Sequence, residues 1–480
     1  MSLKNQFLKA SAFSILSEIV AKIIGPFGFL LLTRILSPED FGVVAVATTV
    51  LGFGYVISDM GISQVIIQQR GDNEYLLKLN NAGFWFNLTM GIILFALMVF
   101  FSEKLASLLG EPSSKSVISV LALQVIFYSL SSVQNAIRKR DLDFKFLFYL
   151  RLITVAAPLL VSIPLAFAGA GYWAIVYGQI FGSLSSTIAL WKTSKWKPSL
   201  YFDLSILRSI LSKSIWNTID QIFIWIPLAF DTYLISNYLS SKELGLYSTS
   251  RTLFSTAITL SIGAIMPVLF STISKIQTDD RVFIKSILIF QKIVFSIAIF
   301  MCVGVFIFSG LIENIIFTNM WVGISNVFGL IFLMMGFEYF YSVIVESLNA
   351  KGHFKITAIN SVLTVLISVP FLFFSINYGL IFYVTIRMSL IYLRFPIIFY
   401  YSRKINKISF VDCLINNKNV IYIIIGLLLL NLLISQFDFT IIINNGLKLL
   451  LFCLAGASFL LLEKESLLSL KNKFKFDKSI

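Results

Sequence analysis

The sequence predicts an all-α polytopic membrane protein built from two similar halves. Hydrophobic residues make up 58% of the 480 residues, charged residues make up 13%, and the mean hydropathy is +0.88. Soluble domains carry about 25% charged residues, so this composition indicates a chain that lies largely in lipid. The length of the apolar stretches and an internal repeat support the same class.

Apolar stretches long enough to cross a bilayer follow one another along the chain. About 20 helical residues, each rising 1.5 Å, span the hydrocarbon. The sequence lacks the ten-residue alternation that is typical of membrane β-barrel strands. We therefore expect about fourteen transmembrane helices, near residues 12–33, 42–66, 80–101, 116–136, 147–168, 172–191, 214–237, 245–270, 283–308, 322–345, 357–375, 378–399, 420–435 and 447–462.

A degraded repeat relates the two halves. Leu36–Gly42 reads LSPEDFG and Leu239–Gly245 reads LSSKELG, and each segment lies between apolar stretches. Such repeats are typical of transporters whose substrate lies between the halves. We expect an N-lobe at residues 1–200, a C-lobe at 201–402, and a C-terminal helix pair with a basic tail at 403–480. Weaker matches pair Phe144-Lys145 with Phe354-Lys355, Pro164 with Pro370, and Gly171-Tyr172 with Asn377-Tyr378.

The net charge of +14 is distributed as a topology signal. If the N-terminus is placed inside, 26 of the 38 Lys and Arg residues lie in inside segments. Basic residues accumulate in cytoplasmic connections, so we expect both termini in the cytoplasm and no nucleic-acid partner. The outside connections hold four basic residues, which are Arg34, Lys104, Lys115 and Lys242, and Lys448 lies at the start of the last predicted stretch.

The residues needed for enzyme chemistry are missing from the sequence pattern. Three scattered cysteines and one histidine, His353, predict neither a disulfide framework nor a metal site. No connection exceeds about 25 residues, and none holds a phosphate-binding Gly-rich loop or a carboxylate pair. We therefore expect a carrier without catalytic residues.

Charged side chains inside the apolar stretches are the candidates for transport. Each costs roughly 2.5–3.5 kcal/mol at mid-membrane, so it must be paired, reach the interface or face water. The candidates are Glu18, Lys22, Asp59 and Arg151 in the first half, and Asp220, Asp231, Arg251, Lys292, Glu338, Arg387 and Arg394 in the second.

Two groups of these charges are predicted to lie at one level. Glu18 and Lys22 are four residues apart on one helical face, and Asp59 lies at a similar depth in the next stretch. Asp231 and Arg251 flank a short connection, which an antiparallel hairpin would bring together. Each group has two interpretations: an ion pair that locks adjacent helices, or the wall of a hydrated substrate cavity.

Several segments resemble one family as a set. Up to about residue 400, the chain is similar to the polysaccharide-transport, or O-antigen flippase (Wzx-like), proteins of the multidrug/oligosaccharidyl-lipid/polysaccharide exporter superfamily. The segments that carry this resemblance are LLTRILSPEDFGVVAVA, SDMGISQVIIQQR (58–70), IRKRDLDFKFL (137–147), GAGYWAIVYGQ (169–179), DTYLISNYLSSKELGLYSTSRTL (231–253) and MPVLFSTISKIQTD (266–279).

The resemblance implies a MATE-like fold, in which two six-helix repeats form lobes around a V-shaped central cavity. It also implies that stretches one, two, seven and eight line this cavity. The family's cavity is cationic, whereas acidic groups on these four stretches outnumber basic ones here by four to two.

The resemblance further implies a flippase of the bacterial inner membrane, with a membrane-embedded lipid-linked substrate. It would move undecaprenyl-pyrophosphate-linked oligosaccharide repeat units of an O-antigen, capsule or exopolysaccharide from the cytoplasmic to the periplasmic leaflet by alternating access. We expect no cofactor, an H⁺ or Na⁺ gradient as energy source, and a polysaccharide polymerase and a chain-length regulator as candidate partners. Candidate substrate-binding residues are Arg251, Lys22, Arg387 and Asp231, and candidate ion-coupling residues are Glu18, Asp59 and Asp220.

Two alternatives remain open at this point. One is a cation-coupled multidrug antiporter of the same superfamily, which would bind a small amphipathic cation at the acidic groups. The other is a membrane scaffold of an envelope assembly complex that transports nothing.

The charge bias makes a topology prediction. Reporter fusions should place Lys242 outside and Arg403 inside, because basic connections are retained in the cytoplasm. An alkaline phosphatase fusion should be active at the first position, and a fluorescent protein that folds only in the cytoplasm should be active at the second. Finding both positions on one side would contradict the arrangement.

Overall fold

The computed structural model describes residues 24–462, except 70, 142, 202, 264, 267–268, 270–272, 274–279 and 438–440. Every regular element in this part of the chain is a helix, as the composition predicts. The chain divides into two compact units, Met1–Thr249 and Ser250–Ile480, and each unit is described by itself.

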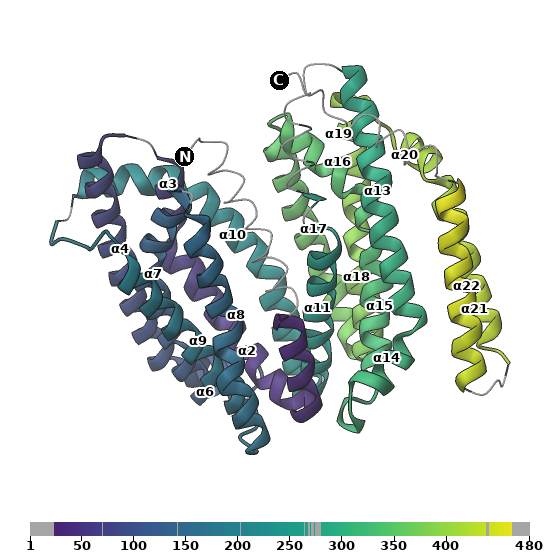
Figure 1. The fold of residues 1–480 in the computed structure, drawn as a ribbon, viewed down its shortest axis with the longest axis horizontal. Helices are drawn as coiled ribbons and strands as arrows, with labels where there is room; N and C mark the ends of the chain where they lie inside the picture. Colours follow the sequence, from purple (N-terminus) through teal and green to yellow (C-terminus); the bar gives the residue numbers. More distant parts are fainter. Residues whose placement is uncertain are drawn as a thin grey trace. The chain divides into compact units, whose positions relative to one another are not determined.

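The first unit is a helical bundle in which α8 packs along α9, and α4 and α9 both pack against α7 (Figure 1). A short helix, Ile24–Ile35, precedes the labelled elements. These are α2 (Pro38–Asp59), α3 (Ile62–Gln68), α4 (Asn73–Phe100), α5 (Ser102–Leu108), α6 (Ser114–Leu121), α7 (Leu123–Arg140), α8 (Phe144–Phe167), α9 (Tyr172–Thr193), α10 (Leu204–Tyr238) and the first part of α11 (Ser241–Ser261).

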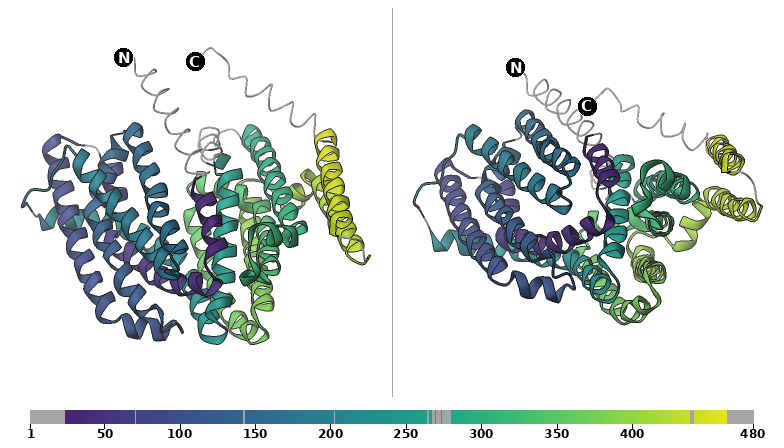
Figure 2. Two further views of the ribbon diagram at one scale, coloured as in Figure 1. Left: turned by 60° about the horizontal axis from the view of Figure 1, so that its bottom comes forward. Right: turned by 90° about the horizontal axis from the view of Figure 1, so that it is seen from below.

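In the second unit, α13 packs against α15 and α16, and α21 and α22 form an antiparallel pair that also contacts α13 (Figures 1 and 2). Its α-helices are α13 (Asp280–Ile307), α14 (Ser309–Ile316), α15 (Ile324–Gly336), α16 (Tyr339–Ala350), α17 (Phe354–Ser375), α18 (Leu380–Ser389), α19 (Arg394–Ile405), α20 (Phe410–Asn416), α21 (Lys418–Ile434) and α22 (Ile441–Leu462). Short 3₁₀ turns are η1 (Asn319–Trp321), η2 (Ile376–Tyr378) and η3 (Leu390–Leu393).

Helix length and composition identify a multi-pass membrane protein. Within the described residues, 8 helices are long and apolar enough to cross a membrane, or up to 10 if each of two bent helix pairs is one span. Every predicted stretch from 42–66 onward overlaps a helix, but α10 and α11 are not among these candidate spans. The stretch at 12–33 lies mostly outside the described residues, so the number fourteen stays a prediction.

Some predicted stretches are not single helices. The stretch at 42–66 is interrupted where Met60 (φ 42°) and Gly61 (φ 74°) adopt left-handed backbone and separate α2 from α3. The pair α15 and α16 is bent by 47°, and the pair α20 and α21 by 70°. Hydropathy reports apolar length only, so these breaks are not visible in it.

The two copies of the repeated segment begin their helices in the same way. Ser37 caps α2, with a capping box in which its hydroxyl accepts from the Asp40 N–H and the Asp40 carboxylate accepts from the Ser37 N–H. Before α11, the Ser240 hydroxyl likewise accepts from the Glu243 N–H and also donates to the Glu243 carboxylate. A Ser followed three residues later by an acid is a local helix-start signal, and both copies retain it.

In each repeat copy, the glycine also lies in close contact with the backbone of the other copy. A Cβ atom at Gly42 would overlap the carbonyl group of Ser241, and a Cβ atom at Gly245 would overlap the carbonyl group of Pro38. Pro38 and Ser241 are the first residues of α2 and α11, so the two contacts are reciprocal. Only glycine permits this approach, because the obstacle is backbone rather than a movable side chain.

Among the weaker repeat matches, only the phenylalanine pair occupies equivalent positions, because Gly171-Tyr172 lies at the start of α9 whereas Asn377-Tyr378 lies in η2, before α18. Phe144 is the first residue of α8 and Phe354 is the first residue of α17. The helices that follow, α9 and α18, are each preceded by a glycine with positive φ, Gly171 at 55° and Gly379 at 90°.

The first compact unit ends at Thr249, whereas the predicted N-lobe ends at residue 200. The unit extends further because α10 packs against α2, α3 and α4. The functional lobe boundaries stay a prediction.

The reciprocal glycine contact predicts a coupled loss of stability. Gly42→Ala or Gly245→Ala should lower the free energy of unfolding by about 1–3 kcal/mol, because overpacking forces backbone to move. The double variant should lose less than the sum of the two, since the first alanine already separates the segments. Thermal unfolding of detergent-purified protein measures the effect.

Gly426→Ala in α21 is the matched control, because a Cβ atom there meets nothing within 4 Å and alanine favours a helix. It should be neutral or slightly stabilising. Equal stability of the Gly42, Gly245 and Gly426 variants would contradict the close approach.

Candidate functional site

A carboxylate occupies the break between α15 and α16. Gly336 ends α15 and Glu338 immediately precedes α16. Successive i→i−3 hydrogen bonds, from the N–H of Glu338 to Met335 at 3.0 Å and from that of Phe340 to Phe337 at 3.0 Å, tighten the chain through the break. Broken helices at membrane depth are tolerated where they border protein or a cavity, and they often carry transport sites.

Three arginines of the second unit are electrostatic neighbours of this carboxylate. Arg394, Arg251 and Arg387 each interact electrostatically with Glu338. The Tyr341 hydroxyl donates to Glu338 Oε1 at 3.4 Å, and the Arg394 side chain is hydrogen-bonded to Tyr341. The carboxylate at the helix break therefore has basic side chains as its electrostatic neighbours.

The cluster retains an unused donor. The Nε atom of Arg394 is buried and has no hydrogen-bond partner among the described residues. A buried donor without a partner costs about 1–3 kcal/mol, and more when it is charged. A guanidinium group is well suited to phosphate and carboxylate oxygens. The arrangement can therefore bind an anionic group.

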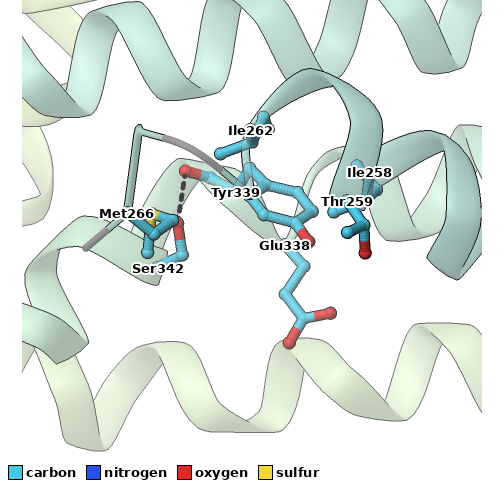
Figure 3. Close-up of a pocket in the computed structure, with 8 residues that line it drawn as sticks. Ile258, Thr259, Ile262, Met266, Glu338, Tyr339 and Ser342 are labelled. Atoms are coloured by element: carbon cyan, nitrogen blue, oxygen red, sulfur yellow. Dashed lines mark hydrogen bonds between the residues drawn. The ribbon is translucent and has the colours of Figure 1, made fainter. Parts of the chain in front are cut away.

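A pocket of about 280 Å³ adjoins the helix break. Figure 3 shows the ring of Tyr339 projecting toward Ile258 and Thr259, while the side chain of Glu338 extends away from that ring. The Ser342 hydroxyl donates to the Tyr339 carbonyl at 3.3 Å. The pocket thus combines apolar walls with a carboxylate and hydroxyl groups, as small-molecule sites commonly do.

The first unit holds a second polar group, centred on Asp59 at the end of α2. Asp59 is 9% exposed. Its Oδ1 atom accepts from the Ser63 hydroxyl at 2.6 Å and from Asn87 Nδ2 at 3.3 Å, and Asn87 Nδ2 also donates to Ser132 at 2.9 Å. Among the described residues, no Lys or Arg forms an ion pair with Asp59.

Aromatic and amide groups continue this network across the bundle. Tyr128 interacts electrostatically with Asp59 and packs against Tyr55, with ring centroids 5.0 Å apart. The Tyr55 hydroxyl donates to Gln124 Oε1 at 3.0 Å, and Gln124 Nε2 donates to Gln179 at 3.3 Å. Side chains from α2, α4, α7 and α9 therefore form a polar interior around one acidic group.

The structure brings some of the predicted site residues together. Arg251 and Arg387 both reach Glu338. Asp231 is 1% exposed and accepts from the Tyr247 hydroxyl at 2.7 Å in the first unit. Arg251 belongs to the second unit, so the predicted pairing of Asp231 with Arg251 stays a prediction. Glu18 and Lys22 lie outside the described residues, as does the side chain of Asp220.

Sequence reasoning assigned no role to Glu338 or Arg394. Both were recognised as costly charges in apolar stretches, but no spacing in the sequence brings them to Arg251 and Arg387. One signal was available: Glu338 is an acidic residue within an apolar stretch, two residues after Gly336. The basic residues of the cluster also come partly from the twelfth stretch, outside the four stretches that the resemblance implies as cavity walls.

The amino-acid sequence is similar to those of known proteins. Residues 31–326 match the family model described as "Polysaccharide biosynthesis protein". The chain is 25% identical over 307 residues to the succinoglycan biosynthesis transport protein ExoT of Rhizobium meliloti (strain 1021), covering 64% of this chain and 61% of that protein. It is 21% identical over 287 residues to the lipopolysaccharide biosynthesis protein WzxC of Escherichia coli (strain K12), covering 58% and 57%. The alignments thus span about three-fifths of these two relatives.

Solved structures share the fold. The lipid II flippase MurJ in an inward closed conformation matches with a TM-score of 0.72 at 17% identity, covering 94% of this chain and 98% of that one. An inward-facing MATE family multidrug resistance transporter of the MOP superfamily matches with a TM-score of 0.67 at 14% identity, covering 82% and 99%. These matches confirm the predicted MATE-like fold class, and the family match over 31–326 shows that the chain belongs to the polysaccharide biosynthesis protein family of multi-pass membrane proteins.

Proposed function

We propose that this protein is a flippase for lipid-linked oligosaccharide repeat units of a bacterial surface polysaccharide. The observation that carries the proposal is the cluster of Arg251, Arg387 and Arg394 around Glu338, with an unpartnered Nε atom on Arg394. The cluster lies in a chain of the polysaccharide biosynthesis protein family. An undecaprenyl-pyrophosphate-linked oligosaccharide offers an anionic group of the kind that such arginines bind.

The physical task explains why arginine side chains inside the membrane are useful. A sugar head group cannot cross hydrocarbon unaided, because each unsatisfied polar group costs several kcal/mol there. A pyrophosphate adds charge, whose transfer costs far more unless it is paired. Guanidinium groups that are already held in place replace lost hydration through charge-assisted hydrogen bonds, while the lipid tail stays in the bilayer.

In this proposal, the substrate moves from the cytoplasmic to the outer leaflet of the inner membrane. The protein moves it by alternating access. The Asp59 network is the candidate ion-coupling site, since a buried carboxylate among neutral donors and acceptors can take up H⁺ or Na⁺. Arg251 and Arg387 act on the substrate. A polysaccharide polymerase and a chain-length regulator are the proposed partners.

One observation favours a second candidate function. Asp59 has no basic partner in the described part of the chain, and such a carboxylate also suits a small amphipathic cation. A cation-coupled antiporter would use Asp59 for its substrate and the arginine cluster for structure alone. The two functions make different predictions for a strain that lacks the gene.

Deleting the gene should stop surface polysaccharide, while complete lipid-linked repeat units accumulate on the cytoplasmic leaflet. The decisive measurement is the completeness and the leaflet of the accumulated intermediate, read with a probe that cannot cross the membrane. Complete units exposed outside would point to a failed polymerase, and incomplete units to a failed glycosyltransferase. Normal surface polysaccharide with lowered drug tolerance would reject the flippase in favour of the antiporter.

Arg394→Gln should reduce polysaccharide export about tenfold or more in a complemented deletion strain. It removes charge-assisted hydrogen bonds worth about 1.5–3 kcal/mol, and about 1.4 kcal/mol corresponds to a tenfold change in rate. Arg251→Gln and Arg387→Gln should act in the same direction. The measurement is surface polysaccharide, normalised to the amount of tagged protein in the membrane.

Arg403→Gln is the matched control, because Arg403 is exposed on the same helix as Arg394 and should not affect export. Glu338→Gln separates stability from binding: it leaves three arginines without their carboxylate, so it should lower the unfolding temperature. If Arg394→Gln inserts stably and exports at the wild-type rate, the arginine cluster is not a substrate site.

A further inference from the structure

The first unit contains a polar pocket that the proposed transport site does not use. It has a volume of about 560 Å³ and lies between α4, α7 and the segment that follows α9. Its lining includes Asn80 from α4, Gln134 and Arg140 from α7, and Trp196 from the following segment. The volume is within the range of about 300–1,000 Å³ that small-molecule sites occupy.

Unpartnered polar atoms gather in this one pocket. Asn80 is 3% exposed and Gln134 is 1% exposed. Several polar atoms here are buried and have no hydrogen-bond partner among the described residues: the Oδ1 atom of Asn80, both amide atoms of Gln134, the Nη1 atom of Arg140 and the Nε1 atom of Trp196. Buried polar atoms are almost always paired, so this concentration of open donors and acceptors indicates a group that the protein itself does not supply.

The pocket is positively charged. Four basic side chains and one acidic one line it. Arg138 is already engaged, with Asp143 at 2.6 Å and with the ring of Phe146, whose centroid is 4.6 Å away. Arg140 directs only its Nε atom to Asp141, at 3.5 Å. The side chains of Lys195 and Lys197 are exposed at the rim, and neither forms an ion pair in the described part of the chain.

The unpartnered polar atoms and the basic side chains of the pocket indicate the chemistry of its ligand. The Arg140 guanidinium and the two lysines suit a phosphate. The carboxamides of Asn80 and Gln134 offer donors and acceptors, which is what a hydroxyl group requires. Leu77, also in the lining, is 50% exposed, so the pocket opens beside apolar surface. The basic residues also place it at the end of the bundle that the charge bias predicts to be cytoplasmic.

We propose that this pocket binds a phosphate ester that carries free hydroxyl groups, with the glycerol-phosphate head group of an anionic membrane lipid as its source. Basic pockets between transmembrane helices on the cytoplasmic side are suited to anionic lipid head groups. The acyl chains would lie over the apolar surface at Leu77. This inference does not depend on the transported substrate, because none of these residues belongs to the Glu338 cluster or the Asp59 network.

The test uses the full-length protein in nanodiscs of phosphatidylcholine alone, or with added phosphatidylglycerol or phosphatidic acid. Bound lipid is counted by native mass spectrometry, and the unfolding temperature is measured in each composition. Phosphatidylglycerol should bind in preference to both other lipids and raise the unfolding temperature. Phosphatidic acid has the phosphate but lacks the glycerol hydroxyls, so it should bind more weakly.

Two variants remove the proposed contacts. Arg140→Gln and Gln134→Met should each weaken phosphatidylglycerol binding about tenfold or more. Lys139→Gln is the matched control, since it removes a charge next to Arg140 from an exposed side chain that does not line the pocket. It should bind phosphatidylglycerol like the wild type. Folding of each variant is checked by its unfolding temperature in phosphatidylcholine.

Soluble sn-glycerol 3-phosphate, added to phosphatidylcholine nanodiscs, distinguishes the two sources of the ligand. It could bind as tightly as the lipid and with the same dependence on Arg140 and Gln134. That result would support a hydroxylated phosphate ester as the ligand, but would identify a soluble molecule rather than a lipid as its source. Equal binding of phosphatidic acid and phosphatidylglycerol, unchanged in Gln134→Met, would overturn the role of the hydroxyl groups. The pocket would hold only water if neither phosphatidylglycerol nor sn-glycerol 3-phosphate binds and if Gln134→Met is more stable than the wild type in every lipid. That result would overturn the proposal.

Discussion

The hydrocarbon of a bilayer offers no water to a polar group, and this constraint governs the whole molecule. It explains why every described regular element is a helix, since a helix satisfies its backbone internally. It also explains the behaviour of buried hydroxyl groups, which fold back onto their own helices. Thr49 donates to the Ala45 carbonyl at 2.8 Å, and Ser129 donates to that of Val125 at 2.8 Å.

The same constraint makes the exceptions informative. A polar atom that remains unpaired in such a molecule is costly, and two of the places where the described residues retain such atoms carry the proposals made above. One is the helix break at Glu338, where Arg394 retains an open donor. The other is the pocket at Asn80 and Gln134. The first lies in the second unit and the second in the first unit, and the two proposals rest on different residues.

The repeat contributes something different, which is close contact between equivalent segments. Gly42 and Gly245 hold corresponding places in the two copies, and each permits the approach of the other copy's helix start. The Ser-x-x-acid start beside each glycine fixes where its helix begins.

The sequence by itself determined the features that depend on local or cumulative properties. Hydropathy sums along the chain, so the helical, multi-pass class and the position of most helices followed from it. The helix starts at Ser37 and Ser240 follow a signal that acts within one turn, but the stretches predicted from hydropathy begin later, at residues 42 and 245. The family resemblance rested on residues that stay together in sequence, and the family match over 31–326 confirms it.

The tertiary structure decided what distant residues do together. Arg251, Glu338, Arg387 and Arg394 come from α11, the break before α16, α18 and α19, and no spacing relates them. The break itself depends on packing, since a Cβ atom at Gly336 would lie 2.7 Å from that of Cys302 in α13. Likewise, the open groups at Asn80 and Gln134 are polar residues of ordinary appearance in sequence. Whether a polar atom finds a partner is a property of three-dimensional packing, and for that reason only the folded chain revealed these sites.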